Sequence, residues 1–285
     1  MSGADAVADG ALRARKTWRT GEPLHGMIYF VPEAAKAYAR LGITGRAGYF
    51  ASRAAPMGAV SADVVVSTFF NFNPELVRVA VPAVWEMATP AQLIAARFLA
   101  VDRSWRRLLG DATVESAEMA RAAALARPLA QQAARHAEGR PLAAAHAEIA
   151  WPAEPHLVLW HAQSILREFR GDGHVALLVV HGLTGVEALV THAAAGEVPA
   201  RVLQATRGWP DETWAAAVDA LCGRGWIEPG DTLRFTASGE ARRAEIEEGT
   251  DALAAAPYDA LGEDQCAELR ALVRPWSRIF AQHLR

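Results

Sequence analysis

The side chains of this chain best suited to hold a ligand gather in its N-terminal half. They are Tyr49, Arg53, Met57, Phe70 and Asn71. Tyr49 and Arg53 are four positions apart and therefore share one face of a helix. An arginine beside aromatic side chains and a methionine predicts a wall for an aromatic or carboxylated ligand. In the alternative interpretation the aromatic residues belong to the core, and Arg53 pairs with a carboxylate such as Asp63.

A second group of candidate binding residues consists of the histidines His174, His181 and His192. His174 and His181 are seven positions apart, so on one helix they lie too far apart to bind the same metal ion. A metal or haem site would need a further ligand, such as His161 or Glu168. Asp172 would orient the His174 imidazole if the two touched, as the partner of a general base does. The ordinary alternative is that each ring bonds to the backbone or to a nearby acid.

Other catalytic signatures are missing from the sequence. It contains no G-x-S-x-G motif, no phosphate-binding glycine loop and no dinucleotide fingerprint. The sequence therefore identifies neither a cofactor nor a catalytic residue.

The elements that carry the candidate residues are helical by their periodicity. Helices are expected over 32–42 and 46–58, and a buried helical stretch that begins near Ser61 and continues past Pro74 is expected to kink or split at Pro82. The fold class is therefore mainly α, in two helical halves. We expect a disordered or loosely packed N-terminus over 1–22, an N-terminal helical domain over 23–150 and a C-terminal winged-helix-like domain over 151–285.

The C-terminal half contains the pattern of a helix-turn-helix. Residues 201–251 predict a helix, a turn, a second helix, a short strand pair and a long helix. The stretch LCGRGWIEPGDTLRFTASGEARRAEIEEGTD (221–251) resembles the wing and the following helix of the MarR class of regulators. This resemblance implies a MarR-like winged helix with a short β-hairpin wing. In that class the helices at the chain ends form the dimer interface, so a homodimer stays open as an alternative.

Most of the chain, residues 24–280, resembles an actinobacterial family. The stretches that carry the resemblance are LHGMIYFVPEA, YFASRAAPMG, TFFNFNP, DGHVALLVVHGLTGVEALVTHAAAG and RGWPDETW. Members of that family are helix-turn-helix or MarR-like proteins of unassigned function. The resemblance thus implies a winged-helix element but no particular reaction or ligand.

The helix expected to enter DNA, residues 210–225, carries the wrong charge for that role. Its charged and aromatic positions are Asp211, Glu212, Trp214 and Asp219. Recognition helices instead present Arg, Lys, Asn, Gln, Ser or Thr to base edges. Residues 201–285 contain 10 arginines against 14 carboxyl side chains, which disfavours contact with phosphates. DNA is therefore a disfavoured partner, although Arg207, Arg242 and Arg243 leave a few phosphate contacts open.

Composition excludes several other classes of protein. A formal net charge of −3 creates no global attraction to nucleic acid or to an anionic membrane. Cys222 and Cys266 form no paired motif, which excludes a zinc site built on thiolates. The apolar runs are far shorter than a membrane span, and the N-terminus lacks a secretion signal. We therefore expect a cytoplasmic protein without a membrane partner.

Three functional hypotheses follow from these features. The first is a small-molecule-binding protein of MarR-like winged-helix ancestry that holds an aromatic or planar ligand between its two halves, with DNA binding weak or lost. The second is an enzyme that acts on such a ligand, with a histidine as acid, base or metal or haem ligand and Arg53 as substrate anchor. The third is a ligand-responsive transcriptional regulator.

Overall fold

The computed structural model describes residues 3–284, with side chains from residue 8 onward, and confirms that the fold is mainly α. The helices are α1 (Gly3–Gly26), α2 (Pro32–Ala39), α3 (Arg46–Ala54), α4 (Ala62–Phe69), α5 (Pro74–Ala80), α6 (Val84–Met87), α7 (Pro90–Leu109), α8 (Asp111–Val114), α9 (Ala117–Arg135), α10 (Pro141–Ala147), α11 (Pro155–Val180), α12 (Gly185–Ala194), α13 (Ala200–Arg207), α14 (Asp211–Gly223), α15 (Ala237–Leu253), α16 (Ala255–Leu261) and α17 (Glu263–Ala281), with short 3-10 turns η1 (Met27–Tyr29) and η2 (Ala55–Met57). Residues 1 and 2 of the N-terminal segment predicted over 1–22, and residue 285 of the C-terminal domain predicted over 151–285, lie outside the described residues.

Proline and capping residues determine where many helices begin. Helices α2, α5, α7, α10 and α11 have proline in their first turn, where the missing N–H leaves no hydrogen bond unmade. Thr89 and Thr184 form capping boxes with Gln92 and Glu187 at the starts of α7 and α12. The predicted break at Pro82 is present, because this residue lies between α5 and α6, but the stretch from Ser61 is also interrupted at residues 70–73 and is not one helix.

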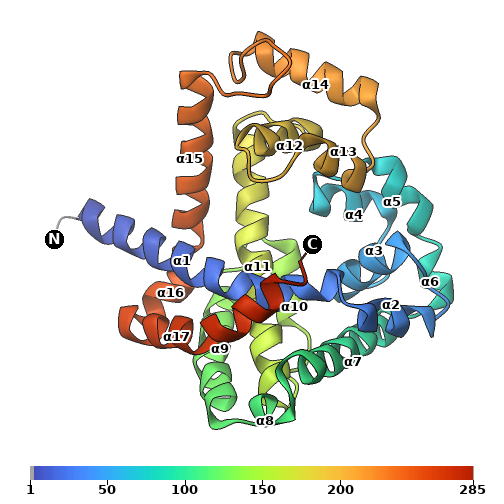
Figure 1. The fold of residues 1–285 in the computed structure, drawn as a ribbon, viewed down its shortest axis with the longest axis vertical. Coiled ribbons are helices and arrows are strands. Elements are labelled where there is room, and N and C mark those ends of the chain that lie inside the picture. Colours follow the sequence, from blue (N-terminus) through green and yellow to red (C-terminus); the bar gives the residue numbers. More distant parts are fainter. Residues whose placement is uncertain (1–2, 285) are drawn as a thin grey trace.

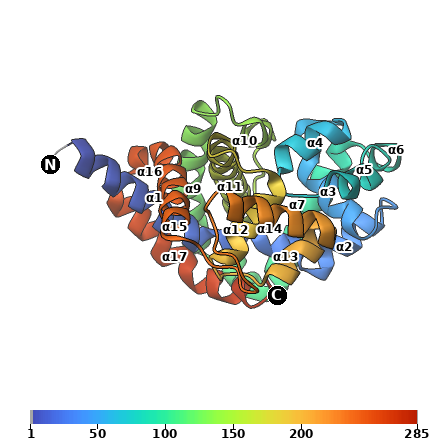
Figure 2. The same ribbon diagram turned by 90° about the horizontal axis from the view of Figure 1, so that it is seen from above.

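Helix α11 runs through the middle of the molecule and joins two hydrophobic cores (Figure 1). The larger core contains residues from α1–α10, the first part of α11 and the last helices of the chain. The smaller core lies around the C-terminal end of α11 and α12–α14. Helices α2–α6 lie on one side of α11, and α15–α17 lie on the other (Figures 1 and 2). The change from one core to the other falls between Phe169 and Leu178, inside α11.

The N-terminal segment differs from the expectation of a loosely packed start. It forms α1, which packs against α11, α15, α16 and α17. Arg13 of α1 bonds Asp259 at 2.6 Å and Glu263 at 3.1 Å, and Leu24 is fully buried. The sequence of this segment alone suggests that it is too polar to pack. The partners of its charges, such as those of Arg13, belong to helices more than 200 residues away in the sequence, so local sequence does not reveal them.

The smaller core is built by α12, α13 and α14, which we call the helix-turn-helix unit. Gly208 ends α13 in the left-handed conformation, with φ of 73°, and Trp209 and Pro210 complete the turn to α14. Trp214 and Leu221 of α14 are buried in this core. The helix-turn-helix order predicted from the sequence is therefore present.

The turn of the helix-turn-helix unit rests on the docking loop, residues 70–73, which connects α4 to α5. The side-chain amide of Asn73 donates to the carbonyl oxygen of Gly208 at 2.7 Å. The indole N–H of Trp209 donates to the carbonyl oxygen of Asn71 at 2.9 Å. These bonds fasten the unit to the N-terminal part of the chain.

The predicted β-hairpin wing is wrong. In the described part of the chain the only β pairing is a single antiparallel bridge between Ile227 and Phe235. Pro229 has no N–H to donate and Gly230 has φ of 147°, so the chain turns here instead of pairing. Thr236 then caps α15 directly after the bridge, which leaves no length for strands. The unit is therefore followed by a loop and not by a winged hairpin.

No single helix within residues 3–284 is long and apolar enough to cross a membrane. Two helix pairs, Pro74–Met87 with Pro90–Leu109 and Pro155–Val180 with Gly185–Ala194, reach the required length and composition together, but they bend by 98° and 99°.

Candidate functional site

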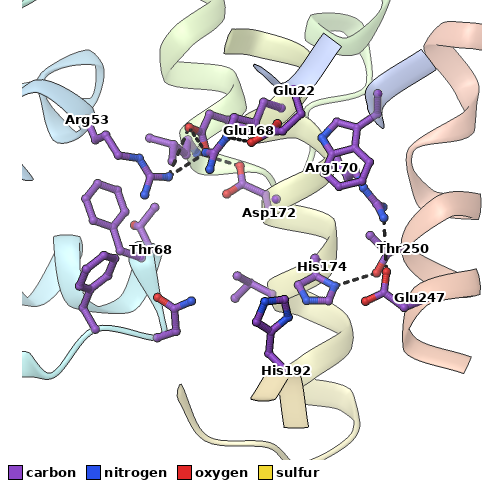
Figure 3. A pocket seen from close by; sticks show the side chains of 18 of the residues that line it. Glu22, Arg53, Thr68, Glu168, Arg170, Asp172, His174, His192, Glu247 and Thr250 are labelled. Carbon is purple, nitrogen blue, oxygen red and sulfur yellow. Dashed lines mark hydrogen bonds and ion pairs between the residues drawn. The ribbon is translucent and has the colours of Figure 1, made fainter. Parts of the chain in front are cut away.

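A cavity of about 480 Å³ lies where the two cores meet, beside the middle of α11 (Figure 3). Its walls come from α1, α3, the end of α4, the docking loop, α10–α13 and α15. The lining contains seven arginines, five carboxyl side chains, two histidines and four aromatic rings. Small-molecule sites commonly have volumes of about 300–1,000 Å³ and combine apolar walls with a few polar groups. This cavity has a suitable size but an unusually charged lining.

Glu168 is the centre of the charge network on the α3 side of the cavity. Its carboxylate accepts hydrogen bonds from Arg53 at 3.1 Å and from Arg167 at 2.9 Å. Arg167 also donates to Glu22 at 3.0 Å, and Arg53 donates to the hydroxyl of Tyr49 at 2.8 Å. One network therefore holds α1, α3 and α11 together.

This network keeps Glu168 ionised. Burial alone would raise the pKa of Glu168, but the guanidinium groups of Arg53 and Arg167 outweigh it and lower the pKa to about 2. The Glu168 side chain is only 3% exposed, so solvent does little to screen its charge. The carboxylate and its two arginines therefore depend on one another.

A second charge network fastens α15 to the opposite wall. Arg170 forms ion pairs with Asp251 at 3.0 Å and with Glu247 at 3.5 Å. Its guanidinium group stacks on the ring of Trp18, 4.3 Å from the centroid. Arg243 pairs with Glu247 at 2.6 Å on the same helix. This side of the cavity is thus closed by α1, α11 and α15.

Contact with α15 fixes the tautomer of His174. The hydroxyl of Thr250 donates its only proton to the carbonyl of Ile246 at 2.6 Å, so it accepts from Nδ1–H of His174 at 2.9 Å. Nε2 of His174 is then an unprotonated acceptor, and burial lowers the pKa of His174 to about 4. His192 lies close to it (Figure 3), and burial lowers the pKa of His192 as well. Both imidazoles are therefore neutral at neutral pH.

Asp172 does not orient His174, contrary to the sequence-based expectation. Its carboxylate accepts the backbone N–H groups of Leu142 and Ala143, both at 3.0 Å, at the start of α10. Burial raises the pKa of Asp172 to about 6 despite these two hydrogen bonds. The orienting partner of His174 is Thr250 instead.

The structure brings five of the eight predicted ligand-binding residues to the cavity. These are Tyr49, Arg53, Asn71, His174 and His192. The lining does not include Met57, Phe70 or His181. Met57 lies behind the wall near Thr68, Phe70 packs in the smaller core, and His181 ends α11 beside Trp226. That the five residues at the cavity bind a ligand stays a prediction.

The proposed pairing of Arg53 with Asp63 is wrong. Arg53 does pair with a carboxylate, but this carboxylate belongs to Glu168 of α11. Asp63 is exposed and bonds Arg78 at 3.0 Å. A partner 115 positions away in the sequence leaves no local spacing signal.

The ligand-binding residues predicted from the sequence did not include several residues that line the cavity. They are Trp18 of α1, Arg170 of α11, Arg207 of α13 and Thr250 of α15. Trp18 lies in the segment expected to be loosely packed, and Thr250 lies in a helix expected to support a wing. In the sequence, the clearest indication that this segment is ordered is the tryptophan flanked by arginines in residues 13–19. An aromatic residue of this kind is unusual in a disordered terminus.

Residues 3–284 contain no group of three or more His, Cys, Asp or Glu side chains arranged to hold a metal ion. Glu168, one of the further ligands considered for a metal site, is instead engaged by two arginines. His161, the other, packs against Trp151 and Phe98, with centroid distances of 4.8 Å and 5.7 Å. These two residues therefore act in different parts of the molecule.

The solvent-facing side of α14 is acidic. Asp211, Glu212 and Asp219 are exposed, whereas Trp214 is buried and unavailable to a partner. The exposed positions between the acids are mostly alanines. This surface offers DNA neither positive charge nor base-reading side chains.

Comparison with known families adds one finding. Residues 14–284 match a family described as a helix-turn-helix family. The match covers both cores and the cavity between them, but it does not extend to the MarR class or to an actinobacterial group. The chain has no match among curated proteins or among solved structures.

Proposed function

Because the chain belongs to the helix-turn-helix family, we propose that it is a regulatory protein whose helix-turn-helix unit responds to a small organic ligand held in the cavity between its two cores. The ligand is planar or aromatic, and direct contact with DNA is weak or lost. The observation that carries this proposal is the position of the cavity, because residues of α12 and α13 line it together with α1, α3 and α11.

The link between ligand and unit runs through the docking loop. Asn71 lines the cavity, and its carbonyl oxygen also accepts the Trp209 indole N–H of the unit's turn. A ligand that moves Asn71 therefore acts on the orientation of α13 and α14. His174 offers an acceptor with a fixed direction, which supports binding of a ligand in a single orientation.

Filling the cavity tests this function. Gly171 of α11 lines the cavity, and a Cβ added there meets only the Glu168 carboxylate at an ordinary 3.7 Å. We expect Gly171→Leu to weaken binding of 2-naphthoate and 2-naphthamide at least about tenfold, because the added side chain occupies ligand space. Isothermal titration calorimetry on the full chain measures both affinities.

The matched control is Gly171→Ala, which adds the Cβ without filling the cavity. We expect it to keep both affinities and to raise the free energy of unfolding by about 0.5–1 kcal/mol, since glycine is unfavourable inside a helix. If the native chain binds neither probe, or if Gly171→Leu binds as the native chain does, the cavity is not a ligand site.

Direct DNA binding is the second candidate function, and membership of a helix-turn-helix family favours it. The acidic face of α14 opposes it, so we expect no retardation of a random-sequence duplex in a gel even at about 50 mM salt. Reversing the charge of that face, with Asp211→Lys, Glu212→Lys and Asp219→Lys together, is expected to allow retardation, because lysines can contact phosphates. Salt-dependent retardation by the native chain would instead show that the unit contacts DNA directly.

A further inference from the structure

The cavity contains one arginine that the protein itself does not balance. Six of the seven arginines in its lining have a carboxylate oxygen of the chain at 2.6–3.9 Å. The seventh, Arg207 at the end of α13, has no such partner among residues 8–284. A charge withdrawn from water without a counter-charge is costly. The site is therefore electrostatically suited to receive a negative group.

Arg207 is held in place but keeps donor capacity. Its Nη1 donates to the hydroxyl of Thr206 at 3.1 Å, whereas its buried Nε has no hydrogen-bond partner among residues 8–284. The guanidinium group lies over the ring of Phe72, 4.7 Å from the centroid. The carbonyl oxygen of Arg207 accepts from the backbone N–H of Asn73 at 3.0 Å. Both ends of the residue are thus fixed against the docking loop.

The surroundings of Arg207 favour an anion over a neutral ligand. Burial lowers the pKa of Arg207, and the nearby Arg53 and Arg167 lower it further, yet a guanidinium group in a protein stays protonated. The carboxylates nearest to those two arginines, Glu168 and Glu22, are already bound to them. These carboxylates therefore do not neutralise the positive charge of Arg207, and an anionic ligand can balance it.

Aromatic rings form the wall next to this charge. Phe72 and Tyr49 both line the cavity, with their centroids 5.5 Å apart. The ring centroids of Phe69 and Phe72 are 6.5 Å apart, and the Arg53 guanidinium group lies over the Phe69 ring, 4.2 Å from its centroid. This wall suits a flat apolar body that directs an acidic group toward Arg207.

We propose that the ligand of this cavity is a small aromatic anion whose carboxylate is bound by Arg207. The assignment rests on the proposed function and specifies the ligand class. A planar guanidinium group binds a carboxylate through two parallel hydrogen bonds, which a neutral amide of the same shape cannot match in strength. Arg207 belongs to the helix-turn-helix unit, so the same contact joins the ligand to the element that it controls.

Two probes of equal shape test the charge preference. The full chain is titrated calorimetrically with 2-naphthoate and with 2-naphthamide, which differ only in the charged group. We expect 2-naphthoate to bind at least about tenfold more tightly. In Arg207→Gln the preference disappears, because 2-naphthoate loses affinity while 2-naphthamide does not. Arg207→Lys keeps the charge without the planar fork and retains part of the preference.

The matched control is Arg201→Gln, which removes the same charge from an exposed position of the same helix. It is expected to leave the preference unchanged. If both probes bind the native chain equally, or if Arg207→Gln keeps the preference, the assignment to Arg207 is wrong. The proposed cavity function still stands in that case if Gly171→Leu removes binding of both probes. If neither probe binds, both proposals fail.

Discussion

Replacing Glu168 with glutamine is expected to lower the free energy of unfolding by about 3–5 kcal/mol, as does the removal of one partner from a buried ion pair. Arg53 and Arg167 both donate to this carboxylate inside the protein. A glutamine amide would leave their charges unbalanced and would point an N–H group at one of them. Urea-induced unfolding of the native and variant chains measures the loss.

Glu268→Gln is the matched control, because Glu268 pairs with Arg121 on the surface. We expect little measurable change in stability there, since exposed ion pairs are screened by solvent. The loss in Glu168→Gln should be constant above about pH 5. The folded-state pKa of Glu168 is lowered from 4.5 to about 2, so its stabilising effect is complete above the unfolded value and fades as pH falls toward 2. A loss no larger than that of Glu268→Gln would refute the central role of Glu168.

Gly185→Ala is expected to separate the helix-turn-helix unit from the docking loop. Gly185 begins α12, and a Cβ there would overlap the backbone carbonyl of Phe70. A backbone atom cannot turn aside as a side chain can, so α12 or the loop must shift. Phe70 already adopts φ of 52°, which side-chain-bearing residues rarely use, and has little freedom to yield.

Overpacking of this kind commonly costs about 1–3 kcal/mol, which urea-induced unfolding detects. The shift should also weaken 2-naphthoate binding, because Asn71 and Phe72 of the docking loop line the cavity. Gly223→Ala is the control, since a Cβ at the end of α14 meets nothing within 4 Å. Equal behaviour of the two variants would mean that contact with the docking loop does not hold α12.

The local patterns in the sequence predicted the helices and the turn better than they predicted the wing. The residues Gly208 and Pro210 fix a turn by their own backbone preferences, so the helix-turn-helix order could be predicted without tertiary information. The prediction of a hairpin was wrong because a pair of strands needs several consecutive residues that are free to form backbone hydrogen bonds. Pro229 and the cap at Thr236 remove that length.

The cavity was only partly predictable, for a different reason. Tyr49 and Arg53 share a helix face, and this spacing marked them as neighbours. Glu168 and Arg207 come from distant helices, and their roles depend on which charges the fold places beside them. That Arg207 has no carboxylate partner among residues 8–284 is a property of three-dimensional pairing, which the order of residues along the chain does not contain.

The packing of α1 also determines when the cavity can form during synthesis. Arg15 of α1 lies against Asp251 of α15, 236 positions later, and α1 packs on α17 as well. During synthesis α1 leaves the ribosome long before α15, α16 and α17 have been made. It therefore lacks most of its contacts while the middle of the chain is synthesised. Closure of the cavity thus requires synthesis of α15, and a nascent chain stopped before α15 lacks one wall of the site.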